Sequence, residues 1–168
     1  MKTKSSLPKS RKNYYVDIAA LVPFLMLLFT GIIMLMYHTG TSKLENILSR
    51  DGHFWLNTHI AFAIISSMII LVHLSLHLNW FRKLFSAKRN KYWFRNLMLV
   101  ILFFVTAFTS FIPLLILEES TASSMILGIH NKFGLLLIAF FIIHLLSYSK
   151  WLISTTQKVF IKNTKKEV

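Results

Sequence analysis

Two segments of the sequence carry pairs of histidines at the same interval. His59 and His73 are 14 residues apart, and so are His130 and His144. In an α-helix, 14 residues return the chain to within about 40° of its starting direction and advance it by roughly 21 Å. The two imidazoles of each pair are therefore expected on one face of a helix, at two depths. Imidazole nitrogens in such positions can ligate a metal ion.

Both histidine pairs lie in long apolar segments. The chain has 168 residues, of which 55% are hydrophobic and 15% are charged. A membrane-spanning helix needs about 20 predominantly apolar residues, and the sequence offers four such segments, at about 16–36, 54–78, 97–117 and 126–152. We therefore expect an all-α membrane protein, a four-transmembrane-helix bundle that forms a single domain over residues 1–168.

The distribution of basic residues predicts the orientation of these helices. Lysines and arginines precede the first segment, separate the second from the third and follow the fourth, whereas the other two connections are balanced or acidic. The positive-inside rule then places the N and C termini in the cytoplasm, and a bacterial inner membrane is the expected location of this multi-pass chain. Membrane topology accounts for the net charge of +13, so no nucleic acid is expected as a partner.

This topology brings the histidines into two facing pairs. Because the second and fourth segments run in the same direction, His59 and His130 fall near the outer surface, and His73 and His144 fall near the inner surface. Two imidazoles held across a helix bundle are the axial ligands of a b-type haem. The chain has no cysteine, which excludes thiolate-held iron–sulfur clusters and c-type haem attachment. The spacing predicts two haems b per chain, with these four histidines as iron ligands.

Residues near the outer pair fit this interpretation. Ala63 and Gly134 each follow an outer histidine by four residues, His59 and His130 respectively, and small side chains there leave room for a porphyrin. Lys132 lies two residues after His130. Its ammonium group is expected either to pair with a haem propionate or to extend to the lipid headgroups.

Two residues near the inner pair have open roles. His77 lies one helical turn beyond His73, so it could replace His73 as the inner ligand or contact a propionate. Asp17, near the cytoplasmic start of the first segment, could relay protons, bind a quinol or simply reach water.

A family resemblance rests on a short set of positions: Trp55-x-x-x-His59, His73-x-x-x-His77, Asn79-Trp80, His130 and His144. This pattern resembles the flavinylation-associated cytochrome family, small four-helix membrane di-haem cytochromes b that were formerly a domain of unknown function. The family usually has a histidine where this chain has Asn79, which leaves the choice between His73 and His77 open.

The resemblance implies transmembrane electron transfer through two bis-histidine haems b. Electrons would pass from quinol or the cytoplasmic side to an extracytoplasmic flavin-carrying protein or another redox protein. The chain would then be an electron-transfer subunit of an oxidoreductase system, embedded in membrane lipid, rather than a self-contained enzyme.

Two other functions are compatible with histidines in membrane helices. The first is a proton-coupled transporter or channel component in which the histidines form a relay. The second is a non-redox membrane assembly subunit in which they pack between helices, although this reading gives no reason for the repeated 14-residue interval.

Overall fold

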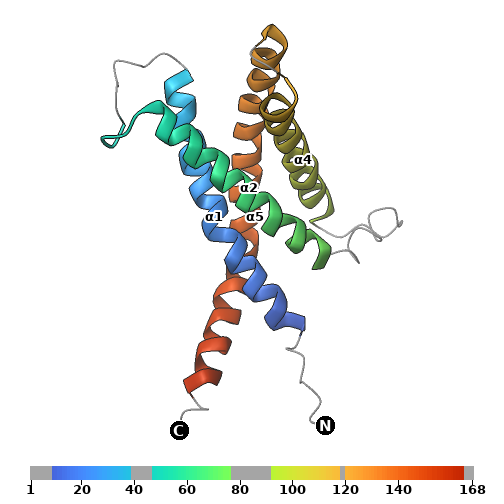
Figure 1. Cartoon of the computed structure of the whole chain (residues 1–168). Helices are drawn as coiled ribbons and strands as arrows, with labels where there is room; N and C mark the ends of the chain where they lie inside the picture. The colour runs from blue at the N-terminus through green and yellow to red at the C-terminus, as the bar shows by residue number, and fades with distance from the viewer. Residues whose placement is uncertain (1–8, 39–46, 77–91, 118–119, 165–168) are drawn as a thin grey trace, which may run out of the picture. The chain divides into compact units, whose positions relative to one another are not determined.

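The structure, a computed structural model, describes residues 9–38, 47–76, 92–117 and 120–164 (Figure 1). Four helices account for most of these residues: α1 (Lys9–His38), α2 (Gly52–Leu76), α4 (Trp93–Leu115) and α5 (Thr121–Thr164). Within the described ranges, the β-type pairing is limited to an isolated bridge next to α2. The predicted all-α class is confirmed.

All four helices are long and apolar enough to cross a membrane. The qualifying stretches are Lys12–Tyr37, Gly52–Leu76, Trp93–Leu115 and Thr121–Val159. Many large apolar side chains on them are exposed, among them Leu115 at 74% and Met68 at 64%. Because such surfaces are unfavourable in water, they fit contact with membrane lipid. The expectation of a multi-pass membrane protein agrees with this composition.

Two of the helices, α1 and α5, extend beyond the predicted apolar segments at both ends. The segment expected at about 126–152 is part of α5, a helix of 44 residues that is roughly 66 Å long, about twice the thickness of a hydrocarbon core. Residues 153–164 contain neither glycine nor proline, so nothing in the sequence stops the helix where it becomes polar. Hydropathy located the part suited to lipid and missed the polar turns.

The described helices fall into two compact units. The first contains α1, α2 and the end of α5 from Gln157, and the second contains α4 and α5 up to Thr156.

In the first unit, α1 and α2 pack in antiparallel directions. Thr30 contacts His59 and Asp17 contacts His73, so residue numbers fall along α1 as they rise along α2. Ser66 lies two helical turns from each histidine on α2 and is completely buried. A small side chain at this position allows the two helices to approach closely. The histidine-bearing face of α2 is therefore turned toward α1.

In the second unit, α4 and α5 are also antiparallel. Thr106, in the middle of α4, contacts His130 near the start of α5, and Asn96 in the first turns of α4 contacts Tyr148 further along α5. The buried apolar side chains described in this unit's helices are Leu102 and Pro113 of α4 and Leu137 of α5. Both units thus place a threonine of one helix opposite a histidine of the next.

A tight turn precedes α2. Ile47 and Arg50 exchange two backbone hydrogen bonds of 3.1 Å, and the residues between them, Leu48 and Ser49, have φ angles of 51° and 59°. The Tyr37 hydroxyl donates to the Arg50 carbonyl and accepts from the Ile47 amide. The end of α1 is therefore tied to the start of α2 despite a strained backbone conformation.

Candidate functional site

His59 is held by a buried threonine of α1. Its Nδ1 atom lies 3.0 Å from the Thr30 hydroxyl oxygen, and Thr30 is completely buried. The same hydroxyl donates to the backbone carbonyls of Met26 and Leu27, at 2.9 and 3.0 Å. Because a hydroxyl has one proton and two lone pairs, this arrangement leaves it to accept a hydrogen bond from His59. The imidazole proton is therefore placed on Nδ1.

Gly31 allows the His59 ring to lie this close to α1. A Cβ atom at Gly31 would be 3.2 Å from Cε1 of His59 and 3.7 Å from its Nδ1. The absence of a side chain at Gly31 is therefore what leaves room for the His59 ring. No residue spacing pointed to Thr30 or Gly31, although their adjacency within an apolar segment is a signal in the sequence.

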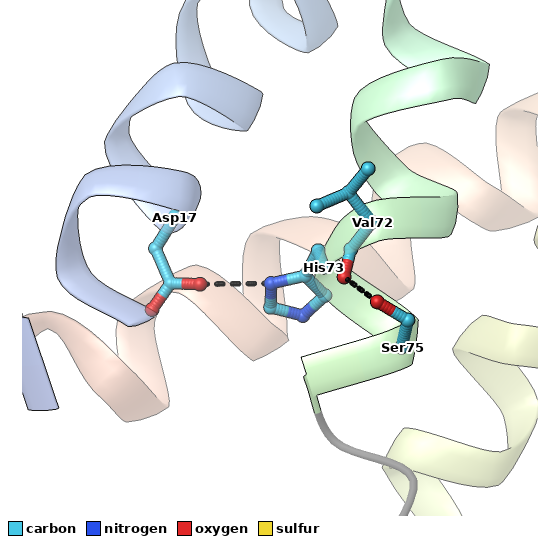
Figure 2. Close-up of polar contacts among 4 residues, drawn as sticks. All are labelled: Asp17, Val72, His73 and Ser75. Carbon is cyan, nitrogen blue, oxygen red and sulfur yellow. Dashed lines mark hydrogen bonds and ion pairs between the residues drawn. The ribbon is translucent and has the colours of Figure 1, made fainter. Parts of the chain in front are cut away.

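His73 is hydrogen-bonded to Asp17 of α1 (Figure 2). Its Nδ1 lies 2.8 Å from Oδ1 of Asp17, and the two side chains are 29% and 21% exposed. Neighbouring Ser75 donates to the Val72 carbonyl of its own helix instead. The sequence left three roles open for Asp17, and the structure directs its carboxylate to this imidazole. An ionised carboxylate only accepts hydrogen bonds, so the proton on this face of His73 is on Nδ1.

His130 is held by the backbone of α4. Its Nδ1 lies 3.0 Å from the carbonyl oxygen of Thr106. A carbonyl can only accept, so His130 also carries its proton on Nδ1. The Thr106 hydroxyl donates instead to the Leu102 carbonyl at 2.7 Å, so Thr106 contacts His130 through its backbone carbonyl.

The three histidines are thus oriented in the same way for metal binding. When Nδ1 carries the proton in a neutral imidazole, the lone pair is on Nε2. Metal-ligating histidines almost always donate their other ring N–H to a carboxylate, a backbone carbonyl or a water. His73 and His130 have acceptors of the first two kinds, and His59 has a hydroxyl. The donor set fits axial ligation of haem iron through Nε2.

The fourth proposed ligand has a different described neighbour. The ring of His144 lies against Tyr148, with ring centroids 4.7 Å apart and planes tilted by 42°. The predicted pairing of His59 with His130, and of His73 with His144, joins residues of the two units and stays a prediction. His77 lies outside the described residues, so the choice of inner ligand also stays open. Among the described residues, no group of three or more histidines or acids could hold a metal ion, but a bis-histidine site needs only two.

The remaining predicted site residues lie on the helices as expected. Lys132 is exposed on α5, and it is not part of an ion pair within the described ranges. A Cβ atom at Gly134 would meet nothing within 4 Å, so there is open space beside this glycine. Ala63 is half-buried on α2.

An apolar groove of about 410 Å³ lies between α1 and α2. It is lined by Tyr15, Val16, Ala19, Met68, Ile69 and Val72. Two of the lining residues, Val16 and Val72, directly precede Asp17 and His73 in the sequence. The groove therefore lies beside the Asp17–His73 hydrogen bond, on the same two helices.

Comparison of the chain with protein families, with curated proteins and with solved structures finds no match. The resemblance to the flavinylation-associated cytochromes therefore stays a prediction from residues and spacing.

Proposed function

We propose that this chain is a membrane electron-transfer subunit that holds two haems b. His59 and His130 ligate one, and His73 and His144 ligate the other. The repeated 14-residue interval supports this assignment because it places one histidine of each helix at each of two depths.

The observation that carries the proposal is that three of the four imidazoles have the same orientation. His59, His73 and His130 each direct Nδ1 at an acceptor on the preceding helix. These acceptors fix both the tautomer and the ring orientation before any ligand binds, and such preorganisation lowers the cost of binding. A histidine that only joined two helices would gain as much from a bond through either nitrogen.

Haem b, when bound, supplies a one-electron couple, and the protein supplies ligands, orientation and a dry environment. We further propose a bacterial inner membrane as the location, with both termini in the cytoplasm. The proposed electron acceptor is an extracytoplasmic flavoprotein or another redox protein. A membrane quinone is the proposed donor, and the apolar groove beside Asp17 and His73 is suited to its hydrocarbon tail.

The first test is a pyridine haemochrome assay with a dithionite-reduced minus oxidised spectrum of the purified chain, expressed in cells supplied with haem. Two haems b per chain, with the sharp α and β bands of bis-histidine ligation, are expected. A chain that folds in the membrane but carries no haem would contradict the proposal.

Histidine variants then test the ligand assignment. His130→Ala is expected to remove one haem and leave the other. The matched control is His53→Ala, at an exposed histidine at the start of α2, and this variant should retain both haems. At the inner site, His73→Ala and His77→Ala should differ. Loss of the inner haem only in His77→Ala would assign that site to His77 instead.

One observation favours a second candidate function. Asp17 and His73 form a hydrogen-bonded pair of ionisable side chains on two helices that are apolar enough to span a membrane, and such intramembrane pairs occur in proton-coupled carriers. A haem-free chain whose reconstituted vesicles take up protons, and whose Asp17→Asn variant does not, would favour this alternative.

A further inference from the structure

Arg95, in the first turn of α4, is a charged residue held by several contacts within the α4–α5 unit. The guanidinium of Arg95 lies over two aromatic rings, with Cζ 4.6 Å from the ring centroid of Tyr92 and 5.3 Å from that of Tyr148. Nη1 donates to the Ser147 hydroxyl at 2.5 Å, and Nη2 lies 3.4 Å from Oδ1 of Asn96. Four residues, from the start of α4 and from α5, thus hold this one cation in place.

All the partners of this cation are neutral. Its Nε atom is buried and has no hydrogen-bond partner among the described residues. A charge that is partly removed from water is costly unless an opposite charge compensates it. The Arg95 cluster, defined as Arg95 with Tyr92, Asn96, Ser147 and Tyr148, contains no such group.

The described residues include no carboxylate that pairs with Arg95. It has six acidic residues in total. Asp17 pairs with His73, and Asp51 accepts a hydrogen bond from the Phe54 amide at the start of α2. Between residues 82 and 156 the acids are Glu118 and Glu119, which follow the opposite end of α4 in the sequence. That helix has 23 residues and is roughly 35 Å long, so the described residues place no carboxylate at Arg95, and we consider an anion from outside the chain.

The position of the cluster indicates which anion this is. The apolar stretch of α4 begins at Trp93, so Arg95 lies where a spanning helix enters the lipid. Phospholipid phosphates occupy this depth, and the planar guanidinium matches phosphate oxygens in a bidentate fashion. Tyr92, the residue before α4, makes no side-chain capping bond, and the exposed amides of a helix start also favour an anion.

We propose that the Arg95 cluster binds the phosphate of an anionic phospholipid such as phosphatidylglycerol. The absence of a carboxylate from the cluster disfavours zwitterionic lipids, because their ammonium groups would have no partner there. The tyrosine rings that could receive an ammonium group are already occupied by the guanidinium. This inference is independent of haem binding.

The test uses the purified full-length chain in neutral detergent. Thermal unfolding and native mass spectrometry are measured during titration with phosphatidylglycerol, with phosphatidylcholine and with inorganic phosphate. Phosphatidylglycerol is expected to bind and to raise the unfolding temperature most. Equal effects of the two lipids would overturn the proposal, and so would full reproduction of the effect by inorganic phosphate, which would point to a soluble anion.

Variants locate the binding to this cluster. Arg95→Gln is expected to weaken phosphatidylglycerol binding at least about tenfold, since hydrogen bonds to charged groups are lost. Arg95→Lys keeps the charge but loses the planar fork, and should recover only part of the affinity. The control is Arg50→Gln, since Arg50 also lies over an aromatic ring, that of Phe54 at 4.9 Å, and precedes a spanning helix. Equal losses in Arg95→Gln and Arg50→Gln would refute the assignment. If Arg95→Gln does not fold, the preference of the unmodified chain for phosphatidylglycerol over phosphatidylcholine still tests the proposal.

Discussion

Replacing Asp17 by asparagine should raise the reduction potential of one of the two proposed haems and leave that of the other unchanged. In the structure, Asp17 is a carboxylate acceptor for His73, whereas His59 and His130 donate to neutral oxygens. An anionic acceptor makes the imidazole a stronger electron donor to its metal, which favours ferric over ferrous iron. Asparagine keeps an acceptor oxygen of similar shape and removes the charge.

The magnitude follows from the change in this hydrogen bond. A bond to a charged group contributes about 1.5–3 kcal/mol and a neutral bond about 0.5–1.5 kcal/mol, so the midpoints of the two ranges differ by about 1.3 kcal/mol. Asp17 and His73 are only 21% and 29% exposed, so water screens the pair incompletely. If the whole difference acted on the ferric state alone, it would raise the midpoint potential by about 60 mV. We therefore expect a rise of a few tens of millivolts, with about 60 mV as the ceiling.

Redox titration of the purified chain, followed in the α band, measures the two potentials. Asp51→Asn is the matched control because it removes the same charge from the start of α2, where Asp51 bonds the Phe54 amide. Asp17→Glu should return the potential toward that of the unmodified chain. An Asp17→Asn variant that retains both haems and both original potentials would refute the reasoning, as would equal shifts in the two aspartate variants.

Further predictions concern other contacts and the tight turn in the first unit. Thr30→Val should lower the free energy of unfolding by about 1–3 kcal/mol, because it leaves the His59 Nδ1–H without its acceptor; thermal unfolding measures this, and Thr58→Val, at a more exposed hydroxyl of α2, is the control. Gly31→Leu should displace His59, whose Cε1 would lie 3.2 Å from a new Cβ, and should remove one haem from the reduced spectrum while sparing the other. Ser49→Gly should stabilise the chain by about 1 kcal/mol, since glycine adopts the φ of 59° without steric cost; an unchanged or lower unfolding temperature would contradict that assignment of strain.

The sequence by itself determined the class of the protein and the helix face on which two of its histidines lie. Four long apolar segments require helices in lipid, because a backbone in hydrocarbon must satisfy its own hydrogen bonds. Helical periodicity likewise places His59 and His73 on one face of α2 without any tertiary information. The polar turns at the end of α5 were missed because hydropathy reports the preference for lipid and not the continuity of a helix.

Only the tertiary structure decided what each histidine contacts. Thr30 and Asp17 lie 29 and 56 positions before their histidine partners, and nothing in helical periodicity relates the rotation of one helix to that of another. That rotation is fixed by close packing at small residues such as Ser66, which brings the hydroxyl and the carboxylate of α1 against the imidazoles of α2. Arg95 illustrates the same limit, because the neutral partners on α5 that distinguish it from other basic residues become adjacent only when α4 and α5 pack.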